Sequence, residues 1–169
     1  AQRLQDALLG AAAPHLAGAD VVIVPPSNLH AVPWSMLPAL RGSRISVAPS
    51  SSTWLRARRS TPPRRKHVAL VRGPNLESEG AEVPTLAELY PKATVLGHGT
   101  ATAERVLAAL DGAWLAHVAA HGAFRSDNPL FSALEMDDGP LTVHDFERLR
   151  RSLYRLILSD CESCVYQAG

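Results

Sequence analysis

The sequence predicts an α/β fold in which helices cover a central, mostly parallel β-sheet. Short apolar runs of strand length alternate with helix-like segments along the 169 residues, and this alternation is typical of a layered fold with parallel strands. Two of the runs, at 114–119 and 154–159, are largely apolar, as expected of strands that are covered on both faces. A chain of this length forms about one domain. We therefore expect a single domain over 1–169.

The first 71 residues are expected to form three strands and the helical segments between them. The segment 1–13 is rich in Ala, Leu and Gln, which favours a helix. A β-branched run at 21–24 stops at two prolines, as a short buried strand does. Pro33 is suited to open a short helical turn. The other expected elements are strands at 45–48 and 67–71 and a serine-capped helix at 51–58.

The second half of the chain continues the alternation and contains clear signals for helix starts. Thr-x-x-Glu at 85–88 and Thr-x-x-Asp at 142–145 have the spacing of a capping box. They predict a helix near 85–90 and another that runs to residue 150. Thr102 is expected to cap a helix that ends at Leu110. Strands are expected at 94–96, 114–119, 134–136 and 154–159, with a loop at 123–132.

Composition and charge argue against several classes of function. The net charge is +1, with 46% apolar and 20% charged residues, as in an ordinary globular protein; no overall field favours nucleic acid or an anionic membrane as partner. No apolar run approaches the roughly 18 residues that span a bilayer, and no signal peptide is recognised. The two cysteines are too close in sequence to close a useful loop, so we expect reduced thiols and a cytoplasmic setting. The basic stretch at 56–66 is expected to be a solvated loop rather than a phosphate site.

The ends of the last two apolar strands carry reactive side chains. His121 with Gly122 follows one strand and Cys161 follows the other. A thiol beside an imidazole is the smallest set of side chains that makes a catalytic cysteine nucleophile. In open α/β sheets reactive residues gather beyond the carboxyl ends of strands. The N–H groups of Gly122 and Cys161 are candidates to stabilise an oxyanion. No Asp or Asn is obviously placed to orient the imidazole, so a dyad is predicted. His117 lies on the same strand face as His121. It is a candidate to orient the dyad, but a packing role is the favoured expectation.

Several blocks of the sequence, in this order and spacing, resemble the CHAT domain family, caspase-like domains associated with tetratricopeptide repeats. The upstream segment 22–37, followed by Ala-Pro-Ser at 48–50, is similar to the N-terminal signature of that family. The resemblance runs from about residue 20 to the end of the chain. The other blocks that carry the resemblance, among them the two that contain His121 and Cys161, are 117–122, 128–132, 138–142 and 156–163.

The resemblance implies a caspase-like three-layer sandwich and a cysteine endopeptidase whose dyad is His121 and Cys161. It further implies a protein or peptide substrate, no cofactor, and control by a helical-repeat region or another partner; many members are bacterial. A small residue usually precedes the cysteine of the family, where this chain has Asp160. Segments after that cysteine normally complete the sheet, and this chain ends before them. We therefore expect an N-terminal, large-subunit-like portion of the domain, either cut or processed.

Two residues near the dyad are candidates for substrate contact. Asp160 is a candidate partner for a basic side chain, because a carboxylate in a cleft pairs well with Arg or Lys. The competing expectation, which the sequence favours, is that Asp160 points away from the cleft or bonds local backbone. Ser132 is a candidate for contact with the substrate backbone.

Two alternatives to a peptidase use the same residues. Two Cys and two His suffice for a structural zinc site, and the chain offers His117, His121, Cys161 and Cys164. The second alternative is a non-catalytic, caspase-like signalling module that retains the dyad residues. A redox-active Cys-x-x-Cys is a poor match, because Glu and Ser occupy its middle positions.

Overall fold

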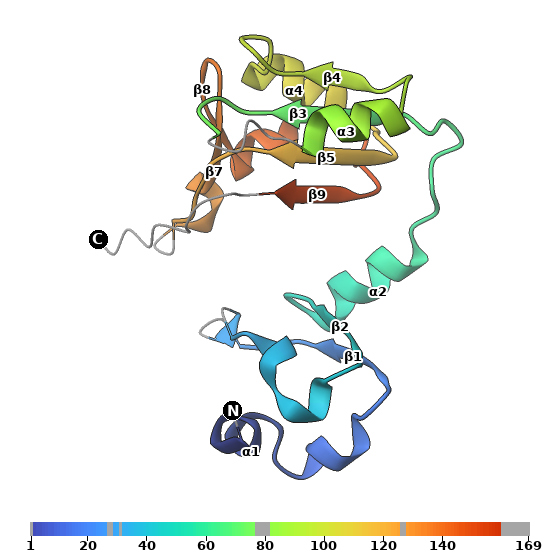
Figure 1. Ribbon diagram of the computed structural model, residues 1–169, viewed down its shortest axis with the longest axis vertical. Coiled ribbons are helices and arrows are strands. Elements are labelled where there is room, and N and C mark those ends of the chain that lie inside the picture. The colour runs from blue at the N-terminus through green and yellow to red at the C-terminus, as the bar shows by residue number, and fades with distance from the viewer. Residues whose placement is uncertain (1, 27–28, 31, 77–81, 126–127, 160–169) are drawn as a thin grey trace. The chain divides into compact units, whose positions relative to one another are not determined.

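A computed structural model of the protein describes residues 2–26, 29–30, 32–76, 82–125 and 128–159 (Figure 1). The chain divides into two compact units, Ala1–Ser60 and Thr61–Gly169, and each is described by itself. The expectation of a single domain over 1–169 stays a prediction. Among the helices of the described ranges, none combines the length and apolar character needed to cross a membrane.

The first unit is built on two parallel strands with short helical segments around them. Val21 of β1 lies beside Ile45 of β2 in the register, and both side chains pack with the buried Trp34 and Leu37. The hydroxyl of Ser50 accepts the N–H of Thr53 at 3.1 Å and caps the second helix. The expected positions of these elements are therefore confirmed to within a few residues. The elements are α1 (Gln2–Leu9), η1 (Gly10–His15), β1 (Asp20–Ile23), η3 (Trp34–Met36), η4 (Pro38–Leu40), β2 (Arg44–Val47) and α2 (Ser51–Arg59).

The second unit contains a four-stranded parallel sheet with the strand order β4-β3-β5-β9 (Figure 1). Successive side chains of a strand point to opposite faces, and β3 shows which helix covers which face. Val68 and Leu70 pack in one cluster with Val83 of α3, whereas Ala69 and Val71 pack in another with α4. The two helices therefore cover opposite faces, which confirms the predicted α/β fold with a mostly parallel sheet. The bounds are β3 (Val68–Arg72), α3 (Glu82–Leu89), β4 (Thr94–Leu96), α4 (Ala103–Leu110), β5 (Leu115–Ala119) and β9 (Leu156–Ser159).

A small antiparallel sheet, with the order β6-β7-β8, follows directly after β5. The loop expected at 123–132 therefore begins with a strand residue and contains a short 3-10 helix. The strand β8 was not predicted, because it opens with Gly139 and Pro140, two residues depleted in strands. Proline is tolerated on an edge strand, which is the position of β8. The elements are β6 (Gly122–Ala123), η5 (Pro129–Phe131), β7 (Ala133–Met136), β8 (Gly139–Thr142) and η6 (Val143–Arg148).

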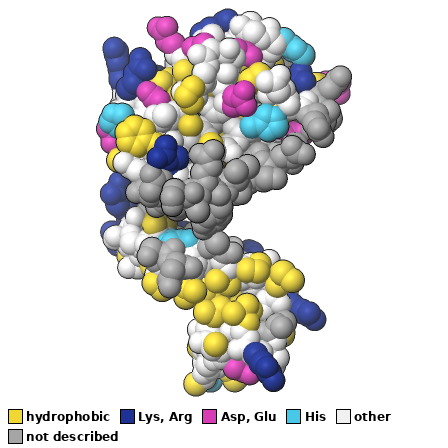
Figure 2. Space-filling model, turned by 90° about the vertical axis from the view of Figure 1, so that its left-hand side faces the viewer, with side chains coloured by type: hydrophobic (Ala, Val, Ile, Leu, Met, Phe, Trp, Pro, Cys, Tyr) yellow, Lys and Arg dark blue, Asp and Glu magenta, His cyan; other side chains and the backbone are white. Residues whose placement is uncertain are grey.

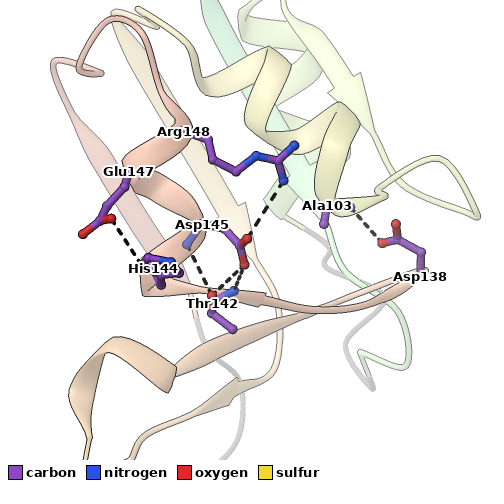
Figure 3. Close-up of polar contacts among 7 residues, drawn as sticks. All are labelled: Ala103, Asp138, Thr142, His144, Asp145, Glu147 and Arg148. Carbon is purple, nitrogen blue, oxygen red and sulfur yellow. Dashed lines mark hydrogen bonds and ion pairs between the residues drawn. The ribbon is translucent and has the colours of Figure 1, made fainter.

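Side-chain caps connect this small sheet to the helices beside it (Figure 3). Thr142 and Asp145 form the predicted capping box, although the helix they open is a 3-10 helix that ends at Arg148. Hydrogen bonds donated by the hydroxyl and the N–H of Thr142 hold the pKa of Asp145 below its ordinary value. The carboxylate of Asp138 accepts the N–H of Ala103 at 2.8 Å, at the start of α4. The β7–β8 turn is therefore tied to a helix of the main sheet.

The helix expected near 85–90 begins earlier than predicted. Its first residue is Glu82, so Thr85 lies inside the helix and does not cap it. Pro84 occupies the first turn, where a missing backbone N–H removes no intrahelical hydrogen bond. The capping-box spacing at 85–88 was therefore a misleading signal.

Candidate active site

The carboxyl ends of β5 and β9 lie side by side in the parallel sheet. Ala119 is the register partner of Ser159, and the N–H of Ala120 donates to the carbonyl oxygen of Ser159 at 3.2 Å. His121 follows Ala119 by two residues, and Cys161 follows Ser159 by two residues. The predicted residues Asp160, Cys161 and Cys164 lie outside the described part of the chain. The shared groove for the sulfur and the imidazole therefore stays a prediction, and the described structure supplies its histidine half.

The imidazole of His121 is held by a backbone oxygen. Its Nε2 lies 2.8 Å from the carbonyl oxygen of Asn75, and since a carbonyl can only accept, Nε2 carries the proton. In the neutral ring Nδ1 is then the atom with the free lone pair. The main-chain oxygen of His121 also accepts the N–H of Glu135 at 2.8 Å. Both the ring and the backbone of this half-buried residue are therefore oriented.

The loop that supplies this oxygen packs tightly against the end of β5. Asn75 has a φ of +56°, a left-handed conformation that asparagine adopts more readily than most residues. Gly73 donates its N–H to the carbonyl oxygen of Ala119 at 2.7 Å. A Cβ at Gly73 would stand 2.7 Å from the backbone oxygen of Glu135 and 2.9 Å from the Cβ of Ala120. Only glycine fits there without a shift of the backbone.

Sequence reasoning missed Asn75 because the orienting group is a main-chain carbonyl, which any residue type supplies. The available signal was the turn sequence Gly-Pro-Asn at 73–75, directly after a buried strand. Such a turn at a carboxyl sheet edge indicates that backbone polar groups face the site.

Gly122 opens β6, and its role as an oxyanion donor stays a prediction. It pairs with Leu134 of β7, one step along from the hydrogen-bonded positions His121 and Glu135. Hydrogen-bonded and non-hydrogen-bonded pairs alternate along antiparallel strands, so the N–H of Gly122 points away from β7. This geometry gives that N–H no acceptor on β7.

His117 is buried four residues before His121 and faces α3 rather than the imidazole of His121. Its Nε2 lies 3.6 Å from a carboxylate oxygen of Glu82, a distance too long for a hydrogen bond. Glu82 has a lowered pKa, chiefly because its own backbone N–H and the Ser159 hydroxyl donate to the carboxylate; burial opposes this shift. His117, in the middle of β5, thus packs beside the carboxylate of Glu82, which also contacts Ser159 at the end of β9.

Ser132 has a structural partner. Its hydroxyl accepts the N–H of Arg125 at 3.0 Å, and its carbonyl oxygen accepts the N–H of Val143 at 2.8 Å. These bonds tie Ser132 to Arg125 and to Val143. Contact of Ser132 with a substrate backbone stays a prediction.

Two cavities lie beside Gly122, and His121 lines one of them. One of about 560 Å³ is lined by both residues and by the β7–β8 hairpin, including Glu135 and Asp137. The other, of about 160 Å³, is mostly apolar and lies between Val118, Leu158 and the small sheet. Figure 2 looks onto the edge to which the arrows of β3, β5 and β9 point in Figure 1, and it shows acidic and histidine side chains next to one another there.

The described residues contain no group of three or more His, Cys, Asp or Glu side chains arranged to hold a metal ion. Two members of the zinc alternative, Cys161 and Cys164, lie outside those residues. The described half of that set does not converge, because His117 faces Glu82 whereas Nε2 of His121 is bound to Asn75. The zinc hypothesis stays a prediction without support from the described residues.

Comparison with known proteins is informative at the level of the family. No curated protein and no solved structure matches the chain. The model of the CHAT domain matches residues 1–168, and the fold is the α/β arrangement with a mostly parallel sheet that the resemblance implied. The chain belongs to the CHAT domain family, a family with a caspase-like fold.

Proposed function

We propose that this protein is a cysteine endopeptidase in which Cys161 is the nucleophile and His121 the general acid and base. The observation that carries the proposal is the hydrogen bond between Nε2 of His121 and the carbonyl oxygen of Asn75 at 2.8 Å. It leaves Nδ1 as the basic atom of a ring that stands at the carboxyl end of β5, beside the strand that leads to Cys161. An imidazole held in one tautomer near a thiol is the arrangement that activates a cysteine.

The chemistry follows from these positions. The thiol of Cys161 gives its proton to Nδ1 of His121, and the thiolate attacks the carbonyl carbon of the scissile bond. The N–H groups of Gly122 and Cys161 stabilise the resulting oxyanion. Collapse of this intermediate breaks the C–N bond, and His121 returns the proton to the leaving amine. A water molecule, deprotonated by His121, then hydrolyses the thioester and regenerates the thiol.

The carbonyl of Asn75 acts in every one of these steps without changing its own state. When His121 is protonated, the ring is a cation, and a fixed carbonyl dipole beside Nε2–H stabilises it. The predicted dyad is thereby extended by a backbone acceptor. The mechanism uses no metal and no organic cofactor. The partners we propose are a protein or peptide substrate and a regulatory helical-repeat region.

The test is turnover of a peptide library by the complete protein, comparing wild type with Cys161→Ala. Loss of the nucleophile is expected to lower kcat/KM by about 1,000-fold or more. Cys164→Ser is the matched control, and it is expected to retain activity. Equal turnover by wild type and Cys161→Ala would remove the proposal. A wild-type protein that binds peptides without cleaving them would favour the non-catalytic signalling module.

A further inference from the structure

The cavity of about 560 Å³ beside His121 is lined by Glu135, a residue that the proposed mechanism does not use. His121 and Glu135 are opposite one another in the antiparallel pairing, because Gly122 pairs with Leu134 and the N–H of Glu135 donates to the oxygen of His121. Side chains of directly opposed residues lie on the same face of a sheet, with Cβ atoms about 5 Å apart. Glu135 is therefore the cross-strand neighbour of the imidazole.

Among the described residues, the carboxylates of Asp137 and Asp138 in this hairpin have hydrogen-bond partners, whereas that of Glu135 has none. Asp137 accepts the N–H of Ala101 at 2.7 Å, and Asp138 accepts the N–H of Ala103 at 2.8 Å. Leu134 and Met136 turn toward the apolar core, so Glu135, which lies between them, projects to the opposite, exposed face. Within the described part of the chain the Glu135 carboxylate takes part in no ion pair.

The chemistry of cleavage determines which part of a substrate lies beside Glu135. The imidazole must reach the nitrogen of the leaving amine to protonate it, and that nitrogen belongs to the residue that follows the scissile bond. The substrate residues after the scissile bond therefore pass on the imidazole side of the site. On that side they meet the wall of the cavity that contains Glu135.

We propose that Glu135 selects substrates with a Lys or Arg side chain in the first positions after the scissile bond. This inference rests on the proposed function and adds the substrate class. A carboxylate in a partly enclosed cavity pairs with an ammonium or, in a bidentate manner, with a guanidinium. The negative charge of Asp137 on the same wall adds to the attraction. An acidic side chain at the same substrate position is repelled.

The experiment uses peptide pairs that differ only at the first two residues after the scissile bond, Arg or Lys against Gln. Wild type is expected to cleave the basic peptide about tenfold faster in kcat/KM, since a hydrogen bond to a charged group contributes that much discrimination. In Glu135→Gln this ratio falls to near one, and in Glu135→Lys it inverts. Glu147→Gln is the matched control, because Glu147 is exposed on η6 and pairs with His144; it keeps the wild-type ratio. A ratio unchanged in Glu135→Gln would overturn the inference.

Binding to the Cys161→Ala protein separates this inference from the proposed function. Fluorescence anisotropy with the same labelled peptides measures recognition without cleavage. If the Cys161→Ala protein binds the basic peptides more tightly, and the double variant Cys161→Ala/Glu135→Gln loses this preference, the role of Glu135 is supported. This result does not depend on whether wild type cleaves the peptides. Equal binding of both peptide classes contradicts that role, while a lack of turnover by wild type contradicts the peptidase proposal instead.

Discussion

Strands β5 and β9 are neighbours with similar apolar sequences, yet their surroundings differ. Residues 116–119 of β5 are all buried, because β5 has a strand on each side and helices over both faces. Leu156, Ile157 and Leu158 of β9 are 37%, 48% and 55% exposed, and within the described residues β9 pairs with β5 alone. An apolar run thus identifies a strand, but its neighbours decide how much free energy its burial contributes.

The same difference applies to the two halves of the candidate site. The end of β5 is fixed by hydrogen bonds to Gly73, to Ser159 and, through His121, to Asn75 and Glu135. The described end of β9 is held by β5 and by the contact of Ser159 with Glu82. We infer that the imidazole half is held by more hydrogen bonds than the described end of β9.

The largest effect is expected where the loop after β3 meets the end of β5. Gly73→Ala places a methyl group 2.7 Å from a backbone oxygen, and overpacking of this kind costs about 3 kcal/mol. Gly99→Ala is the comparison, because nothing lies within 4 Å of its Cβ and only its φ of +82° is unfavourable; about 1 kcal/mol is expected there. Urea unfolding measures the loss in the free energy of unfolding for each variant. A smaller loss for Gly73→Ala than for Gly99→Ala would contradict the tight packing of this loop.

The next effect compares β5 and β9 directly through two register partners, Val118 and Leu158. Val118 is 1% exposed, so Val118→Ala is expected to cost about 2 kcal/mol through lost burial and a residual cavity. Leu158→Ala removes a larger side chain but is expected to cost less than about 1 kcal/mol, because that residue is already half exposed. If both variants lose the same free energy of unfolding in chemical denaturation, β9 is buried to the same degree as β5, which contradicts this contrast.

A smaller effect, on activity rather than stability, is expected at Asn75. A β-branched residue is strained at a φ of +56°, so Asn75→Val displaces the carbonyl oxygen that orients His121. We expect kcat to fall about tenfold with little change in KM, as misplacement of a catalytic group does. Asn75→Gly tolerates the same φ and is expected to remain close to wild type. Equal kcat values for the two variants would contradict the orienting role.

The smallest effect concerns Glu82 of α3, whose carboxylate contacts Ser159 at the end of β9 and lies beside His117 of β5. The pKa of Glu82 is lowered from its ordinary value of 4.5, so its stabilising contribution is present above that pH and is lost as pH falls through the folded-state pKa. Glu82→Gln removes this dependence. Below pH 4.5, unfolding measurements should show a shallower loss of stability in the variant than in wild type. Parallel curves would mean that this carboxylate is not preferentially ionised in the folded state.

Much of this fold could be predicted, because local patterns and tertiary packing agree. The strand at 94–96 and the helix capped by Thr102 occur where periodicity and capping place them. Prediction failed where tertiary contacts outweigh propensity, as in β8, whose Gly139 and Pro140 pair with β7 at a sheet edge. For the site, the position of His121 and Gly122 directly after β5 could be predicted, and their catalytic roles stay predictions. The orienting carbonyl of Asn75 was missed, because any residue type supplies a main-chain oxygen and only the Gly-Pro-Asn turn at 73–75 indicated it.

The most direct measurement of the central claim is the alkylation rate of Cys161 as a function of pH, in a Cys164→Ser background. An imidazole in contact with the sulfur promotes the reactive thiolate, so iodoacetamide should react about tenfold more slowly at pH 6.5 once His121→Ala is introduced. His144→Ala, which removes an exposed imidazole on η6, should leave the rate unchanged. Identical rates with and without the His121 side chain would contradict the account.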